Sequence, residues 1–153
     1  MRKSPASAQP AHQLNDLIEI ARDGERFYLD AASRVRSAQL RSVFRELAEV
    51  RQRLIDDLAR HVSARGEAPS QHATAWGRTR KLYARVLAAI RSDEEAAYIG
   101  ELEQAEDRLL ERYRSALEHA PTEEIRRVLQ RHLLTVKAAH DSMKALKDQI
   151  EVE

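Results

Sequence analysis

Residues 37–69, SAQLRSVFRELAEVRQRLIDDLARHVSARGEAP, contain one complete helical segment with its start and stop signals. Ser37 is of the type that caps helix N-termini, and the Gly-Glu-Ala-Pro run at 66–69 is typical of a helix end. Between them the spacing of apolar residues is that of one helix face. This face consists of Leu40, Val43, Phe44, Leu47, Val50, Leu54, Leu58 and Val62. The stretch predicts a long amphipathic helix over residues 38–64.

Three other segments repeat this pattern, so the chain is predicted to be all-α. The four long helices are expected at about 13–35, 38–64, 94–119 and 122–150. Short breaks follow the first and the third helix, which should make each successive pair an antiparallel hairpin. A crossover at 65–93, with a short helix at about 76–91, should join the hairpins. The sequence therefore predicts a four-helix bundle of two antiparallel hairpins with one long crossover.

The composition is typical of a helical protein and limits the classes of partner and site that we expect. The chain has 153 residues, with only four glycines and four prolines, and 33% of them are charged. Its 26 basic and 25 acidic side chains give a net charge of +1, so we expect no nucleic-acid partner. The chain has no cysteine, which removes thiolate metal sites and thiol nucleophiles from consideration.

No apolar run is long enough to span a membrane, so no membrane partner is expected. Residues 1–12 are basic and polar and lack the apolar stretch of a signal peptide. We expect them to form a disordered tail on a cytoplasmic protein.

Five polar residues interrupt the apolar faces near the middle of the helices. A lone buried charge costs several kcal/mol, so a group with both signs at similar depth suggests mutual pairing in a buried ionic network. The alternative is that the long side chains extend outward to solvent, as happens often in highly charged helices. The five residues are Glu25, Arg51, Glu106, Lys137 and His140.

The remaining polar residues suggest no further site. The chain lacks a glycine-rich phosphate loop, a nucleophile elbow and a His-Glu-x-x-His motif, so no catalytic residue is predicted. Trp76 stands in the polar crossover, where it either pins the crossover to the bundle or marks a contact surface. Five histidines receive no role: His12, His61, His72, His119 and His132.

The chain resembles the ferritin-like superfamily, and within it the rubrerythrin-related proteins. It is most similar to an uncharacterised bacterial branch of four-helix-bundle domains of unknown function. The resemblance covers about residues 13–150. It is carried by LNDLIE at 14–19, DGERFY at 23–28, FRELA at 44–48, AED at 105–107, Tyr113, VKAAHD at 136–141 and LKD at 146–148.

The resemblance implies a di-iron site that this chain has largely lost. The relatives hold two iron ions with a Glu on the first and third helices and a Glu-x-x-His on the second and fourth. Glu106 and His140 match this pattern. The other four ligand positions carry Ala21, Arg51, Leu54 and Lys137. Two of these replacements are cations, which repel Fe²⁺ and can neutralise the remaining acids.

The leading functional prediction is a non-enzymatic, stress-associated or protein-interaction bundle without a cofactor, acting with an unknown protein partner or as a homodimer. The alternative is an iron- or zinc-binding oxidoreductase or metal store that uses Glu106 and His140, with Glu25 as an irregular third ligand. A third reading is an iron-storing cage or a nucleic-acid coat, and the near-zero net charge argues against the coat.

Overall fold

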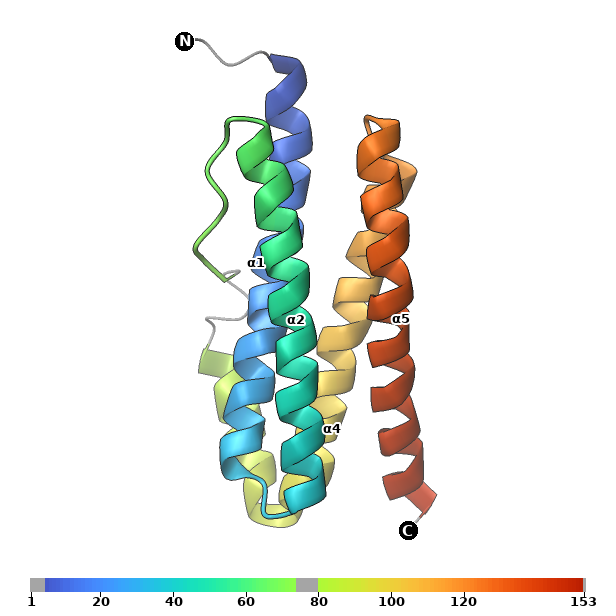
Figure 1. Cartoon of the computed structure of the whole chain (residues 1–153). Helices are drawn as coiled ribbons and strands as arrows, with labels where there is room; N and C mark the ends of the chain where they lie inside the picture. Colours follow the sequence, from blue (N-terminus) through green and yellow to red (C-terminus); the bar gives the residue numbers. More distant parts are fainter. Residues whose placement is uncertain (1–4, 74–79, 153) are drawn as a thin grey trace.

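The structure, a computed structural model, describes residues 5–73 and 80–152. Within them the chain forms an all-α four-helix bundle (Figure 1). The helices are α1 (Pro5–Arg34), α2 (Ala38–Ala64), α4 (Arg80–Glu118) and α5 (Glu123–Val152). The predicted fold class is confirmed. Helix α1 packs mainly on α2, and α4 packs on α5 and α1.

Local signals set the helix ends as the sequence predicts. The Ser37 side chain accepts a hydrogen bond from the Leu40 backbone N–H at 3.2 Å, which caps α2. Beyond its other end, Gly66 adopts a φ of 75°, a conformation that favours glycine. At the start of α5, the Thr122 hydroxyl accepts from the Ile125 N–H at 3.2 Å. These local contacts set both ends of α2 and the start of α5.

Helix α1 begins at Pro5, earlier than the predicted start at residue 13. The predicted disordered tail over 1–12 is therefore wrong for residues 5–12. Ala11 is buried and belongs to the same core cluster as Leu14, so packing favours continuation of the helix here. Pro5 stands in the first turn, where its missing N–H has no helical acceptor, whereas Pro10 lies inside the helix and cannot donate a backbone hydrogen bond there.

The predicted short helix at 76–91, where it is described, and the predicted long helix at 94–119 fall within one element, α4, with no interruption of its helical assignment. Figure 1 shows that α4 does not run straight but turns back at the end of the bundle where α1 joins α2. No proline or glycine occurs between residues 80 and 99 to end the helix. Trp76 lies outside the described residues.

The first part of the crossover is fastened to α1. The Asn15 side chain donates to the Ala68 carbonyl at 3.1 Å and accepts from the Ser70 N–H at 2.8 Å. The Arg22 guanidinium donates to the Ser70 carbonyl. These contacts hold residues 68–70 along the bundle.

The core consists of two apolar clusters with charged residues between them. One cluster includes Ala21, Leu54 and Leu109, and the other includes Tyr28 and Ala48 among its members. On α2 and α4, the buried charged residues between the two clusters are Arg51 and Glu106. No helix among the described residues combines the length and the apolarity needed to cross a membrane.

Candidate functional site

The centre of the bundle holds a buried ion pair between α2 and α4. Arg51 is 1% exposed and Glu106 is 0% exposed. The Arg51 Nη2 donates to Glu106 Oε1 at 2.9 Å, and the Tyr28 hydroxyl on α1 donates to the same oxygen at 2.5 Å. One carboxylate therefore joins three helices through two hydrogen bonds.

Helix α1 provides the space for the guanidinium. Gly24 faces Arg51, and a Cβ at this position would lie only 2.6 Å from Arg51 Cζ. The Tyr28 ring covers another side, with its centroid 6.0 Å from Cζ. Glycine and tyrosine, one turn apart on α1, thus form the recess that holds the charged head of Arg51.

The electrostatics of the centre keep Arg51 and Tyr28 protonated. Burial alone lowers the pKa of Arg51, but the Glu106 carboxylate and its hydrogen bond raise it above its usual value. Burial and the nearby Glu106 charge raise the pKa of Tyr28 well above its usual value. The pair is only partly satisfied, because Arg51 Nη1 and Glu106 Oε2 are buried without a hydrogen-bond partner among the described residues.

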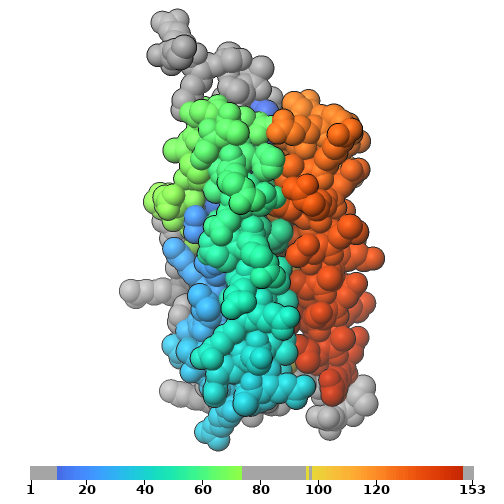
Figure 2. All heavy atoms as spheres, in the orientation of Figure 1, coloured from blue at the N-terminus to red at the C-terminus, as the bar shows by residue number. Residues whose placement is uncertain are grey.

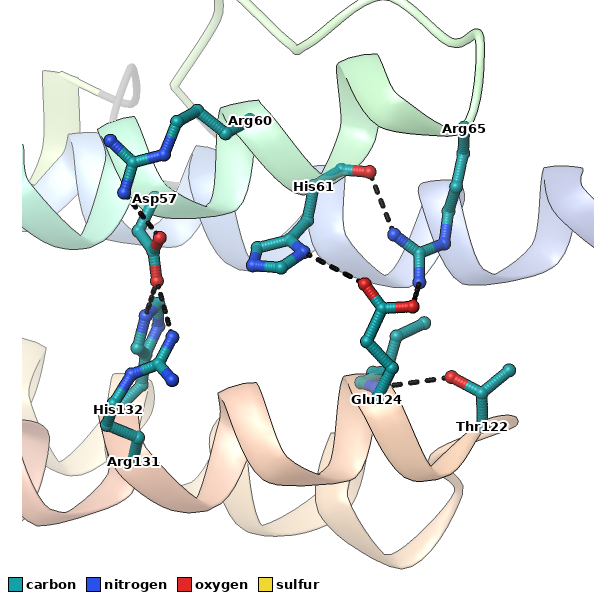
Figure 3. Close-up of polar contacts among 9 residues, drawn as sticks. Asp57, Arg60, His61, Arg65, Thr122, Glu124, Arg131 and His132 are labelled. Atoms are coloured by element: carbon teal, nitrogen blue, oxygen red, sulfur yellow. Dashed lines mark hydrogen bonds and ion pairs between the residues drawn. The ribbon is translucent and has the colours of Figure 1, made fainter.

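A second polar network extends from the core to the surface between α2 and α5 (Figure 3). The buried Tyr113 hydroxyl lies 3.0 Å from Nδ1 of His132. Nε2 of that histidine lies 2.6 Å from Asp57 Oδ2, as Figure 3 shows. Arg131 and Arg60 donate to the same carboxylate. With a neutral imidazole, Tyr113 donates to Nδ1 and Nε2–H donates to Asp57.

Burial and hydrogen bonding set the charges of this second network. Burial lowers the pKa of His132, and Asp57 offsets this only in part. Burial raises the pKa of Asp57, but hydrogen bonds from His132 and two arginines outweigh it and hold that pKa well below its usual range. Burial is also the main reason that the pKa of Tyr113 is raised. The network thus favours a neutral tyrosine, a neutral histidine and an ionised aspartate.

Nearer the end of the bundle, Glu124 on α5 adds a weaker connection to α2. Its carboxylate lies 3.7 Å from His61 Nδ1 and 3.8 Å from Arg65 Nη2 (Figure 3). Glu124 is largely exposed, so solvent screens these pairs. We call the contacts of Asp57 and Glu124 with their partners across the helices the α2–α5 clasp.

Comparison with known families gives one match over residues 9–119, to the family described as a domain of unknown function (DUF2383). The match covers more than half of the chain and includes Tyr28, Arg51 and Glu106. The chain belongs to the DUF2383 family. No match to a curated protein was found.

Of the five predicted network residues in this DUF2383 protein, the structure brings only Arg51 and Glu106 into direct contact. Glu25 is half-buried, and its partial burial raises its pKa although Arg22, Arg26 and Arg51 act in the opposite direction. Glu25 therefore lies at the edge of the centre, where it is influenced by the Arg51 charge.

Lys137 and His140 do not join the buried pair, which corrects the predicted network. Lys137 is exposed on α5. His140 is paired at the surface through Nε2 with Asp107 and through Nδ1 with Asp141. Burial of the ring lowers the pKa of His140, but the hydrogen bonds to these two aspartates raise it above its usual value.

The error on α5 is one of helical phase, and it also explains why His132 was missed. The buried face runs through Ile125, Leu129, His132, Val136, Ala139 and Met143. Leu133, the apolar neighbour of His132 in the sequence, is only half-buried. A regular alternation of four- and three-residue steps from Ile125 to Ile150 includes His132, and this signal could have identified it.

The residues at the centre do not fit a di-metal site of the kind the resemblance implies. The candidate ligands Glu106, His140 and Glu25 do not form a metal-binding group, and the described residues contain no cluster of three or more such ligands. Glu106 is bound by Arg51 and Tyr28. A guanidinium offers no electron pair to a metal and repels a divalent cation.

Proposed function

We propose that this protein is a ferritin-like, rubrerythrin-related bundle whose buried centre is neutralised by its own arginine, and that it acts as a non-enzymatic protein-interaction protein, with a stress-associated role in the bacterial cytoplasm. The observation that supports the proposal most strongly is the Arg51–Glu106 ion pair, because its cation lies at a position where the resemblance implies a metal-binding glutamate.

The burial of the centre supports a role without chemistry. Tyr28, Arg51 and Glu106 are each no more than 1% exposed, so a substrate would reach them only if the helices separated. The Glu106 carboxylate is already bound by the other two residues, and this arrangement favours a structural role. An interaction function would then use the outer surface of the bundle.

Metal analysis tests this proposal. The protein is purified without chelators, incubated with Fe²⁺ or Zn²⁺, desalted and analysed by mass spectrometry for metal content. We expect well below one metal ion per chain, and the same content in Glu106→Ala, because any residual metal would bind at the surface. About one or two ions per chain in the wild type, lost in Glu106→Ala, would contradict the proposal.

A further inference from the structure

The α2–α5 clasp continues inward as a hydrogen-bonded chain of three side chains. Figure 2 shows α2 and α5 side by side along one face of the bundle, and Asp57 on α2 contacts His132 on α5 across them. The same imidazole also reaches α4, where its Nδ1 lies 3.0 Å from the Tyr113 hydroxyl. Tyr113 is 0% exposed and His132 is 5% exposed. The chain therefore leads from a half-buried carboxylate to a phenol in the core.

These three groups stand in the order that makes a histidine a general base. Such a base needs a proton within hydrogen-bond distance, and a carboxylate on its other side fixes the imidazole tautomer and stabilises the imidazolium that forms. His132 meets both conditions, because Nε2–H donates to Asp57 and the Nδ1 lone pair accepts from Tyr113. His132 is thus positioned to accept the phenolic proton of Tyr113.

The burial of Tyr113 limits the reactions that this base can assist. A nucleophile must touch its substrate, but Tyr113 is closed off from solvent within the apolar cluster that includes Leu109 and Leu110. An electron, by contrast, can tunnel through packed protein to an acceptor at the surface. A phenol that loses an electron becomes strongly acidic, so oxidation of a buried tyrosine requires a base within reach. The surroundings of Tyr113 therefore favour one-electron oxidation.

Tyr28 also has a hydrogen-bonded acceptor, but its surroundings oppose the same reaction. Its hydroxyl donates to Glu106, which also accepts from Arg51. A proton passed from Tyr28 to Glu106 would neutralise the carboxylate and leave the Arg51 charge buried without its counter-ion, which is strongly unfavourable. The close contact of Tyr28 with Glu106 therefore does not make it an electron donor.

At Tyr113 the charge balance is the reverse. A proton passed from Tyr113 to His132 creates a cation beside the ionised Asp57, with 2.6 Å between Nε2 and Oδ2. Arg60 and Arg131 also donate to Asp57, but their side chains are 74% and 64% exposed, so solvent screens much of their charge. The carboxylate is thus available to stabilise an imidazolium.

We propose that Tyr113 is a redox-active tyrosine, which gives one electron to a strong one-electron oxidant at the surface while its proton passes to His132. The O–H bond breaks and an N–H bond forms at Nδ1. The products are a neutral tyrosyl radical, an imidazolium paired with Asp57, and the oxidant reduced by one electron. Oxygen-derived radicals and high-potential metal complexes are oxidants of this class. Return of the electron and the proton restores the original pair.

This proposal goes beyond the interaction role and does not depend on the metal content of the Arg51–Glu106 centre. The two proposals can therefore fail separately, one by metal analysis and the other by radical spectroscopy.

Flash oxidation of the full chain tests the proposal. Photo-excited ruthenium tris-bipyridine with a chloropentaamminecobalt(III) quencher supplies the oxidant. Trp76→Phe is the common background, because the single tryptophan also loses an electron easily. We expect transient absorption and electron paramagnetic resonance to show a neutral tyrosyl radical that forms more slowly in heavy water. It should be lost in Tyr113→Phe and retained in Tyr28→Phe. A radical unaffected by Tyr113→Phe would overturn the proposal.

A matched pair of variants on α5 tests His132 as the proton acceptor. His132→Gln keeps a hydrogen-bonding side chain but no base, so radical formation should slow at least about tenfold. His140→Gln makes the same change at a surface histidine and should leave the rate unchanged. Electron–nuclear double resonance needs no variant of His132, and it should detect an exchangeable proton hydrogen-bonded to the radical oxygen. An unchanged rate in His132→Gln, or a radical without this proton, would overturn the role of His132.

Discussion

Arg51 carries a full charge into the interior of the bundle, and its neighbours explain how the fold tolerates this. A buried ion pair loses more hydration than an exposed one, so its net contribution to stability is small unless its geometry is good. Here Glu106 accepts from both Arg51 and Tyr28, and the Tyr28 ring lies beside the guanidinium. The pair therefore depends on each of its members, because removal of one leaves an uncompensated group in the core.

Gly24 provides the sharpest test of how tightly Arg51 is held. In a helix, Gly→Ala normally stabilises by about 0.5–1 kcal/mol. At position 24 the new Cβ would meet Arg51 Cζ at 2.6 Å, and the buried guanidinium cannot move without weakening its bond to Glu106. We expect Gly24→Ala to destabilise the protein by about 1–3 kcal/mol in urea unfolding.

Gly100→Ala is the matched control, because a Cβ at this helical position meets nothing within 4 Å. It should leave the free energy of unfolding unchanged or raise it. If Gly24→Ala stabilised the protein as much as Gly100→Ala does, the guanidinium would not occupy the recess in α1.

At the level of whole helices, α5 carries two histidines with opposite behaviour. The pKa of His132 is lowered from about 6.5, so its contribution to stability is complete above that pH and is lost as the pH falls through the folded pKa. The pKa of His140 is raised, so its contribution is complete below pH 6.5 and is lost as the pH rises through the folded pKa.

Nuclear magnetic resonance titration of the histidine rings checks this difference. His132 should titrate below pH 6.5 and His140 above it. The variants His132→Gln and His140→Gln assign the two signals. Titration of both rings at the same pH would show that the contacts with Asp57 and Asp107 do not distinguish them.

The contact between α1 and the crossover leads to a test by hydrogen exchange. Asn15 both donates to the Ala68 carbonyl and accepts from the Ser70 N–H. Asn15→Ala removes both bonds, so the Ser70 amide should exchange at least about tenfold faster, while amides in the middle of α5 stay unchanged. Unchanged exchange at Ser70 would mean that its bond to Asn15 does not protect this segment.

Local sequence signals predicted α2 well because they act within one turn of the helix ends. Ser37 and Gly66 determine where α2 begins and ends through contacts with their immediate neighbours. The phase of α5 depends instead on Tyr113 and Asp57, which are distant in sequence and together make a buried His132 acceptable. An apolar pattern favours a leucine such as Leu133 over a histidine on a buried face, so the prediction gave His132 no role and placed Lys137 in the interior.

For the molecule as a whole, the two apolar clusters and the charged residues between them form one structural plan. The Arg51–Glu106 pair, a charged interruption of the core, lies where α1, α2 and α4 meet and where α1 leaves room for a guanidinium. Its mixed charges were visible in the sequence, because Arg51 and Glu106 interrupt apolar faces. The sequence did not show which of the five polar residues lie in the buried centre, because helix phase decides which polar side chains reach the interior.

The stability of Glu106→Ala tests the role of this pair most directly. Urea unfolding should show a loss of about 3–5 kcal/mol, because the variant leaves the Arg51 charge buried and unpaired. Replacing both charges, in Arg51→Met with Glu106→Leu, should recover most of that loss. Asp16→Ala removes a half-exposed ion pair with Arg112 between the same two helices that Tyr28 and Glu106 connect, and should cost less than about 1 kcal/mol. A Glu106→Ala variant no less stable than Asp16→Ala would contradict a buried, mutually neutralising centre.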